Sequence, residues 1–439
     1  MPPESNAPNK RLLLLTSKLG YQARSFAEAA ARLGITVVFG SDRCHQLDDP
    51  WKDAALPLHF ERPEEAAAEI VRAAASQPID AILALGDRPT IAAARAASAL
   101  GIEYSPPEAV ETCRNKLRQR TVLRAAGLPV PEFFSFTLRE EPSNVLARVR
   151  FPCVVKPLTL SASQGVIRAN NAKEFTAAVA RIRALLETPE LQVTREPELH
   201  RLLAEDYIPG REVAVEGVLE EGHLRILAIF DKPDPLEGPY FEESIYVTPS
   251  RLHEAEQQAI TACTRSCVAA LELTHGPLHA EFRINASGPW VIEVQPRPIG
   301  GLCSRVLRFG PDRILLEDLL VRHVLGLEGR ELKREEAAAG VMMIPVPASG
   351  IFEGVEGSEE ARAVPGIVEM EVTTRVHDYI AAWPEGASYL GFLFARTDTP
   401  QEAESALRAA HAKLRFDIGS RLPVGHPVTG RLPAGSPRE

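Results

Sequence analysis

The chain has 439 residues, more than one ordinary hydrophobic core accommodates, so its length predicts two to four domains. Its hydrophobic (45%) and charged (25%) fractions are those of a globular protein, and its net charge of −10 argues against general binding to nucleic acid or to anionic membranes. The longest apolar run near the start, Leu12 to Leu15, is far shorter than the roughly 18 residues of a membrane span, so we expect a cytoplasmic protein.

Strand and helix patterns alternate in the first quarter of the chain, after a polar, proline-rich stretch at 1–9 that is predicted to be disordered. They lie at 11–17, 25–34, 35–41, 64–77, 79–87 and 89–101. This alternation predicts an α/β unit over 10–112 with a Rossmann-like, doubly wound parallel sheet. Ligands bind such sheets beyond the carboxyl ends of the strands, and ordinary turns or caps are an equal alternative for the residues there, which are Thr16, Ser17, Gly86 and Asp87.

A second unit is predicted to begin near residue 113. Its first helix, at 115–126, is expected to carry a basic face made of Lys116, Arg118, Arg120 and Arg124. A short buried strand then ends on Lys156, whose charge needs a partner, and small residues follow from Ser161 to Gly165. Such a loop can bring backbone N–H groups onto a phosphate, although serine-rich turns are also common.

An acidic segment follows the next predicted helix. It reads as a strand that ends at Glu205 to Ile208, a turn, and two antiparallel strands around the second turn at 220–222. Backbone groups of such a segment can meet a flat base, and a carboxylate such as Glu212 can meet paired ribose hydroxyls. As an isolated signal it is weak.

The stretch from His279 to Arg305 reads as a hairpin of two short strands. Alternate side chains of a strand share a face, so the hairpin should bring Glu281 near Glu293, Gln295 and Arg297. Two carboxylates and an amide oxygen suit a hard divalent cation such as Mg²⁺. The alternative is a solvated face with alternating charges.

A proline-rich, acidic loop at 230–252 is expected to line an active site, or else to be a solvated loop. Its Lys232, Glu242, Glu243 and Arg251 can hold the charged ends of an amino acid. After about residue 335, strand patterns and an amphipathic helix predict a small α+β domain at 335–425, followed by a flexible tail at 426–439.

Six short motifs stand in a characteristic order. They are NK at 115–116, VVKP at 154–157, the small-residue loop, EDYIPGRE at 205–212, AEF at 280–282 and IEVQPRPIGG at 292–301. This succession, over 113–325, resembles the ATP-grasp superfamily of carboxylate–amine and carboxylate–thiol ligases, most of all its L-amino-acid ligase group. The units at 10–112 and 335–425 are similar to the domains that usually flank an ATP-grasp domain. The resemblance implies the two-lobed ATP-grasp core.

The resemblance also implies roles for individual residues. Lys116 and Lys156 would contact the phosphates of ATP, and Ser161, Ser163 and Gly165 would belong to the mobile loop over them. Adenine would be read at Glu205, Asp206, Tyr207 and Ile208, and ribose by Glu212. Magnesium or manganese would be bound by Glu281, Glu293 and Gln295, and the transferred phosphoryl group by Arg297. Candidate substrate residues are Lys232, Glu242, Glu243, Gly300, Gly301 and Arg305.

The implied reaction converts a small carboxylic acid, above all an amino acid, into an acyl phosphate and couples it to an amine, with release of ADP and phosphate. Gln295 departs from the family, which has asparagine there, and leaves the number of metal ions open. Alternatives are a carboxylase-like or purine-biosynthesis-like enzyme that activates bicarbonate or formate, and a nucleotide-binding regulator without turnover. The expected partners are small molecules, with neither nucleic acid nor membrane, and a homodimer is an open expectation.

Overall fold

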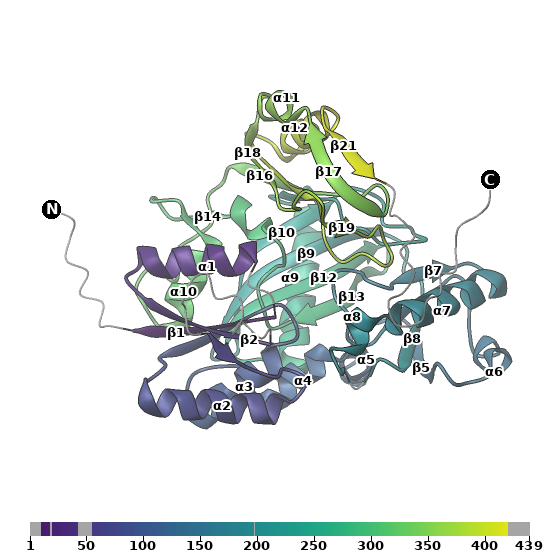
Figure 1. The fold of residues 1–439 in the computed structure, drawn as a ribbon, viewed down its shortest axis with the longest axis horizontal. Helices are drawn as coiled ribbons and strands as arrows, with labels where there is room; N and C mark the ends of the chain where they lie inside the picture. Colours follow the sequence, from purple (N-terminus) through teal and green to yellow (C-terminus); the bar gives the residue numbers. More distant parts are fainter. Residues whose placement is uncertain (1–9, 18–19, 43–54, 197, 420–439) are drawn as a thin grey trace.

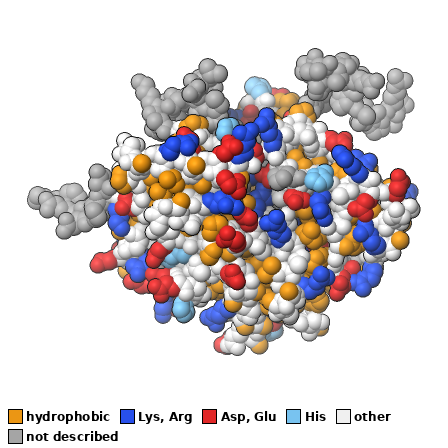
Figure 2. All heavy atoms as spheres, turned by 90° about the horizontal axis from the view of Figure 1, so that it is seen from below, with side chains coloured by type: hydrophobic (Ala, Val, Ile, Leu, Met, Phe, Trp, Pro, Cys, Tyr) orange, Lys and Arg blue, Asp and Glu red, His pale blue; other side chains and the backbone are white. Residues whose placement is uncertain are grey.

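The computed structural model describes residues 10–17, 20–42, 55–196 and 198–419. The disorder predicted at 1–9 and the tail predicted at 426–439 lie outside the described residues. Among the described residues, no helix is both long enough and apolar enough to cross a membrane. Figure 2 shows acidic and basic side chains interspersed over the face seen from below.

The first unit is a parallel sheet with strand order β3-β2-β1-β4. Its elements are β1 (Arg11–Thr16), α1 (Tyr21–Arg32), β2 (Thr36–Ser41), β3 (Leu56–Pro57), α2 (Pro63–Ser76), β4 (Ala81–Leu85) and α3 (Thr90–Leu100). Leu12 and Leu14 pack in one core with α1, whereas Leu13 and Leu15 pack in another with α2 and α3. Alternate leucines therefore serve opposite faces of the sheet, which confirms the predicted doubly wound arrangement.

A small lobe forms the second unit (Figure 1). Helices α4 (Pro107–Arg114) and α5 (Lys116–Ala125) lead into it, and the Asn115 side chain caps α5 by accepting from the N–H groups of Leu117 and Arg118. Its antiparallel sheet has the order β5-β8-β6-β7. The elements are β5 (Phe133–Thr137), α6 (Pro142–Leu146), β6 (Cys153–Pro157), β7 (Ile167–Ala169), α7 (Ala172–Leu186), α8 (Pro189–Gln192) and β8 (Arg201–Asp206).

The predicted basic face of α5 is wrong. Lys116 and Arg120 are buried, at 9% and 1% exposure, because each meets a carboxylate of another element. Only Arg118 and Arg124 of the predicted four are exposed. The helix therefore supplies cations to the interior.

An eight-stranded antiparallel sheet lies at the centre, in the order β13-β12-β9-β10-β11-β16-β20-β18 (Figure 1). Its strands are β9 (Arg211–Glu220), β10 (His223–Lys232), β11 (Ile245–Thr248), β12 (Gly276–Asn285), β13 (Gly288–Gln295), β16 (Ala338–Ile344), β18 (Ile367–Val372) and β20 (Gly391–Thr397). Because β11 pairs with β16, strands from the predicted C-terminal segment continue the sheet of the preceding unit. The C-terminal segment is thereby fixed to the sheet that carries the predicted hairpin.

Helices join this sheet to its neighbours. One face packs on α5 and α9 (Glu254–Ala270), and the other shares a core with β1 and α1 of the first unit, through α10 (Leu316–Val324) and η1 (Cys303–Val306). The remaining elements are β14 (Arg308–Phe309), β15 (Ile314–Leu315), β17 (Gly350–Glu356), α11 (Ser358–Arg362), β19 (Tyr379–Ile380), α12 (Pro400–His411) and β21 (Arg415–Gly419). Shared cores hold the first unit against the central sheet.

Candidate active site

A cavity of about 260 Å³ lies where the small lobe, the central sheet and the first unit meet. It gathers most of the residues singled out in the sequence, although they come from segments far apart in the chain. These are Lys116, Lys156, Ser161, Ser163, Glu205, Asp206, Tyr207, Ile208, Glu212, Glu243, Glu281, Glu293, Arg297, Gly300 and Gly301. One cavity therefore brings these residues together.

Lys156 stands at the end of β6 and finds the counter-charge that the sequence demanded. Its ammonium lies 2.5 Å from one carboxylate oxygen of Glu205. The other carboxylate oxygen of Glu205 accepts a hydrogen bond from Arg120 at 2.6 Å. Burial lowers the pKa of Lys156, and the neighbouring Glu205 opposes this only in part. Burial alone would raise the pKa of Glu205, but the charges of Arg120 and Lys156 outweigh it and bring the pKa below its ordinary value.

The segment predicted to read adenine thus uses its side chains elsewhere. Glu205 is engaged by two cations, and Asp206 pairs with Arg150 at 2.6 Å. The N–H of Asp206 donates to Glu132 and that of Tyr207 to Pro152. What the segment can offer a flat base is the wall of the cavity, lined by Asp206, Tyr207 and Ile208, rather than the Glu205 carboxylate.

The hairpin β12–β13 forms as predicted, with Glu281 directly opposite Glu293. Glu293 lies 3.4 Å from the ammonium of Lys116, which also donates to the carbonyl of Leu160 at 2.6 Å. Glu281 accepts from Lys232 at 2.9 Å, and its pKa is well below the ordinary value. Burial would raise that pKa, but the charge of Lys232 and the bond from His279 outweigh it. Two carboxylates therefore face the cavity side by side, at least one of them firmly ionised.

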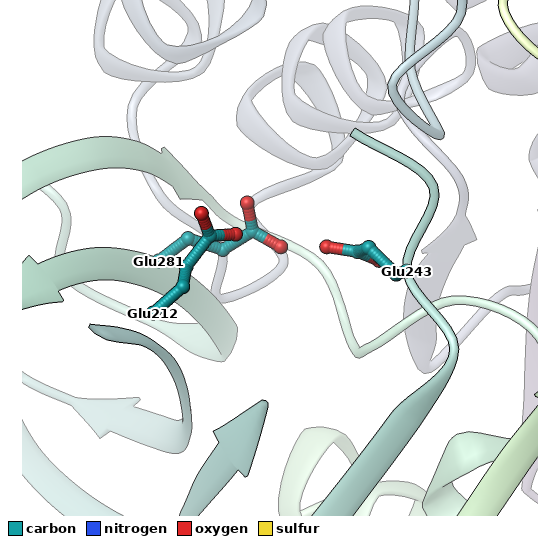
Figure 3. A group of neighbouring side chains, drawn as sticks. All are labelled: Glu212, Glu243 and Glu281. Atoms are coloured by element: carbon teal, nitrogen blue, oxygen red, sulfur yellow. The ribbon is translucent and has the colours of Figure 1, made fainter. Parts of the chain in front are cut away.

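Three carboxylates converge on a single ammonium group at the centre of the sheet. Lys232 lies 2.9 Å from both Glu212 and Glu281 and also contacts Glu243 (Figure 3 shows the three carboxylates). The pKa of Lys232 is raised well above its ordinary value because these three charges outweigh burial. Burial raises the pKa of Glu243 to about 7, partly offset by Lys232. The set that converges differs from the predicted metal set of Glu281, Glu293 and Gln295.

Three of the predicted substrate residues, Lys232, Glu242 and Arg305, are not among the described residues that line the cavity. Lys232 is one, since its three ion pairs leave the side chain 2% exposed. Arg305 pairs with Glu369 and Glu371 of β18. Glu242 is half-buried, and burial raises its pKa. The predicted substrate contacts of Lys232, Glu242 and Arg305 therefore have no geometric support here.

Gln295 does not present itself as a metal ligand either. It is 2% exposed, and its amide nitrogen donates to Glu293 at 2.9 Å and to the carbonyl of Cys113 at 3.1 Å. In this orientation the Gln295 amide nitrogen holds the carboxylate of Glu293 in place. The extra methylene relative to asparagine allows the side chain to reach α4 as well.

Arg297 connects the site to the first unit. It is 9% exposed, its guanidinium binds the carboxylate of Asp87, and it donates to the carbonyl of Pro298 at 3.0 Å. The neighbouring cations Arg297 and Arg114 outweigh burial and bring the pKa of Asp87 to about 2. Asp87 follows strand β4, and the sequence left ligand binding and an ordinary turn as equal alternatives for it. In the structure it pairs with Arg297, the predicted catalytic arginine.

The sequence placed His279 on the strand face of Glu281 and favoured a structural histidine over a site residue, and it assigned no role to Arg283. Both residues line the cavity. Arg283 donates to Glu212 at 2.9 Å and to the carbonyl of Ile208 at 2.9 Å. His279 contacts Glu216 and lies 3.3 Å from Glu281; these two carboxylates outweigh burial and raise its pKa to about 9. The period-two spacing of 279, 281 and 283 on one strand face was the available signal.

The donor set fits a hard divalent cation. Carboxylate oxygens of Glu281 and Glu293, on adjacent strands, are ligands of the type that Mg²⁺ and Mn²⁺ prefer, and Glu281 is held in its ionised form. Lys116 and Lys156 line the same cavity and offer positive charge to phosphate oxygens. The arrangement suits a metal-bound polyphosphate.

Three family models match separate parts of the chain. Residues 27–102 match the ATP-grasp N-terminal domain, 149–306 the ATP-grasp domain, and 342–419 the L-amino acid ligase C-terminal domain 2. The chain therefore carries an ATP-grasp domain. This confirms the recognition from the six motifs and the α/β, ATP-grasp fold class, including the closing domain of amino-acid-ligase type.

Individual relatives of this ATP-grasp protein point the same way. The crystal structure of the L-amino acid ligase from Bacillus licheniformis is 28% identical, with a TM-score of 0.79 over 94% of this chain and 100% of that chain. Carnosine synthase 1 of Gallus gallus is 30% identical over 63% of this chain and 30% of its own length. Alanine–anticapsin ligase of Bacillus amyloliquefaciens is 25% identical over 55% of this chain and 53% of its own length. The chain spans 63% or less of the first curated relatives it matches.

Proposed function

We propose that this ATP-grasp protein is an ATP-dependent ligase that forms a C–N bond. It would phosphorylate a small carboxylic acid, above all an amino acid, and pass the acyl group to an amine, releasing ADP and phosphate. The observation that carries the proposal is the convergence of Lys116, Glu281 and Arg297 on one cavity. The similarity to the L-amino acid ligase and to alanine–anticapsin ligase supports amino acids as substrates.

The small lobe would bind the nucleotide. Lys116 and Lys156 would take the phosphates, while Ser161 and Ser163 would lie over them in a loop that limits access of water. The wall formed by Asp206, Tyr207 and Ile208 would pack against the base. Glu212, already held by Lys232 and Arg283, would accept hydrogen bonds from the ribose.

The central sheet would carry the chemistry. A bound Mg²⁺ or Mn²⁺ would supply positive charge to offset the charge of the phosphate oxygens during in-line transfer. Glu281 and Glu293 would hold it, with Gln295 orienting Glu293 instead of binding the ion. Arg297, fixed by Asp87, would stabilise the phosphoryl group and later the oxyanion formed when the amine attacks. Glu243, Gly300 and Gly301 line the cavity and are the remaining candidates for substrate contacts.

Phosphate release from pairs of L-amino acids tests the reaction. We expect ADP and phosphate to appear only when ATP, a carboxylic acid and an amine are all present. Formation of AMP and pyrophosphate would contradict an acyl phosphate. Bicarbonate-dependent ATP hydrolysis without an amino acid would favour a carboxylase-like enzyme, and nucleotide binding without turnover would favour a regulator.

Glu293→Ala should lower metal-dependent turnover on the order of 100-fold or more, because one of the two proposed metal ligands is lost. Glu360→Ala, which removes an exposed carboxylate on α11, is the matched control and should behave as the wild type. Steady-state rates at several Mg²⁺ concentrations give the result. An unchanged rate for Glu293→Ala would remove the metal assignment.

A cytoplasmic location and a homodimer stay predictions.

A further inference from the structure

The loop proposed to cover the phosphates is held by a second loop, from Ala382 to Gly386, in the C-terminal segment. Three hydrogen bonds cross between them. The N–H of Gly165 donates to the carbonyl of Pro384 at 2.9 Å, and the Gln164 amide donates to the carbonyl of Glu385 at 2.8 Å. In the opposite direction, the Trp383 indole N–H donates to the carbonyl of Ala162 at 3.1 Å.

The covering loop has a backbone that needs such support. Ala162 and Ser163 both have a positive backbone φ angle, at 52° and 54°. Residues other than glycine and asparagine rarely adopt this conformation. Ser161 and Ala162 are exposed, and the sequence from 161 to 165 contains only small or polar residues. A segment with so little burial of its own has little local stability, so contacts from outside decide its position.

The second loop is itself firmly placed. The Trp383 side chain is 6% exposed, and its ring packs against Tyr389, with 5.0 Å between the ring centroids. The N–H of Ala382 donates to the Ser349 hydroxyl at 2.9 Å. Arg181, on helix α7 of the small lobe, donates two hydrogen bonds from its guanidinium to the carboxylate of Glu385, one of them at 2.8 Å. The contact therefore spans two units, with one end on the small lobe and the other on the C-terminal segment.

Trp383 also links the covering loop to another part of the cavity wall. Tyr389, whose ring packs against that of Trp383, lines the cavity together with Ala162 and Ser163. One indole group thus joins the loop over the phosphates to an aromatic wall of the same cavity.

We propose that Trp383 is a positioning residue that holds the 161–165 loop closed over the triphosphate, so that ATP is cleaved only in coupled turnover. The proposal rests on the proposed function, since it takes this loop as the phosphate cover. Loss of the indole hydrogen bond lets the loop open, which weakens binding of the triphosphate and admits water to the reacting phosphoryl group. Water then attacks the γ-phosphorus in place of the substrate carboxylate, ADP leaves, and phosphate forms without ligated product.

Trp383→Phe removes the indole N–H and keeps an aromatic ring against Tyr389. We expect KM for ATP to rise about tenfold, the equivalent of one lost hydrogen bond, and the ratio of phosphate to ligated product to rise above one, with kcat little changed. Trp290→Phe is the matched control, because its indole donates to Asn285 in the β12–β13 turn. A merely structural role would lower the melting temperature and leave the phosphate-to-product ratio at one.

A charge exchange provides a second, independent test. Arg181→Glu and Glu385→Arg should each raise the ratio of phosphate to product, and the double variant should restore it, since the pair is re-formed with opposite polarity. Wild-type ratios in Trp383→Phe and in both single charge variants would overturn the proposal.

Binding measurements separate this proposal from the proposed function. Calorimetry measures the affinities for adenosine and for a non-hydrolysable ATP analogue, and only the analogue has the triphosphate that the loop would cover. Neither ligand is turned over. We expect Trp383→Phe to lose affinity for the analogue about tenfold and to keep its affinity for adenosine. A wild-type protein that binds neither would overturn the proposed function and the proposal together; equal analogue affinity in both proteins would overturn the role of Trp383 alone.

Discussion

A buried lysine lies at each end of the cavity, and the charges of the two lysines are balanced in opposite ways. On the small-lobe side, the cations Lys156 and Arg120 share the single carboxylate of Glu205. On the central sheet, the single cation Lys232 is shared by Glu212, Glu243 and Glu281. The pKa values follow: burial lowers that of Lys156, whereas three carboxylates raise that of Lys232.

This difference makes the cavity electrically polar. The first end has a surplus of positive charge, which suits an anion such as a polyphosphate. The second has a surplus of negative charge, which suits a metal ion or the ammonium group of an amino acid. Glu293, within 3.4 Å of Lys116, lies between the two kinds of charge. One site can therefore hold both halves of a metal–nucleotide complex and its substrate.

Lys232→Met should have the largest effect on stability. It would leave three half-buried carboxylates without their common buried cation. Arg283 would remain beside Glu212 and His279 beside Glu281, so the loss would fall mainly on Glu243. Breaking buried pairs of this kind costs about 3–5 kcal/mol. Chemical denaturation monitored by circular dichroism measures the loss. The double variant Lys232→Met, Glu243→Gln should recover part of it, because one of the stranded charges is removed; a double variant as unstable as the single one would mean that the methionine packs badly.

Lys156→Met should damage nucleotide binding more than folding. Glu205 keeps Arg120 as a partner, so little stability is lost, but a charged donor to the phosphates disappears, at a cost of about 1.5–3 kcal/mol, or roughly 10-fold to 100-fold in affinity for ATP. Calorimetric titration with ATP checks this. Lys173→Met, an exposed lysine on α7, serves as control. A collapse of stability comparable to that of Lys232→Met would refute the asymmetry between the two ends.

Local patterns predicted what depends on local geometry. Alternating strands and helices indicated the parallel sheet, and the period of two along β12 and β13 placed Glu281 opposite Glu293. Lys156 was marked because a lysine at the end of an apolar strand needs a charged partner, whereas Lys116 was marked by the resemblance of the NK motif to the ATP-grasp superfamily. These features require only the neighbours of each residue in the chain.

The choice of partner could not be derived in this way. Periodicity assigns a side chain to a face but does not say which strand will lie beside it. Arg297 and Asp87 meet across 210 positions of the chain, and Lys232 was assigned to substrate although three strands and loops turn their carboxylates toward it. Similarly, the pairing of β11 with β16 carries the central sheet across a predicted domain boundary. Such contacts arise from tertiary packing.

The smallest expected effect concerns pH and the carboxylate-rich end of the cavity. The pKa of Glu243 is raised to about 7 in the folded protein, from an ordinary value near 4.5. The folded state therefore binds a proton more tightly than the unfolded state, and this contribution to stability is fully present below the ordinary pKa and disappears as the pH rises through about 7. Glu243→Gln stays neutral at every pH and lacks this dependence.

Between pH 5 and pH 8 we expect the wild type to lose on the order of 1 kcal/mol relative to Glu243→Gln. Unfolding of both proteins by urea in the presence of EDTA, which keeps metal ions out of the comparison, measures the difference. Glu360→Gln provides the control, because its parent carboxylate is exposed. Parallel pH profiles for wild type and Glu243→Gln would show that Lys232 keeps Glu243 ionised throughout this range, and the surplus of negative charge at this end would then be larger.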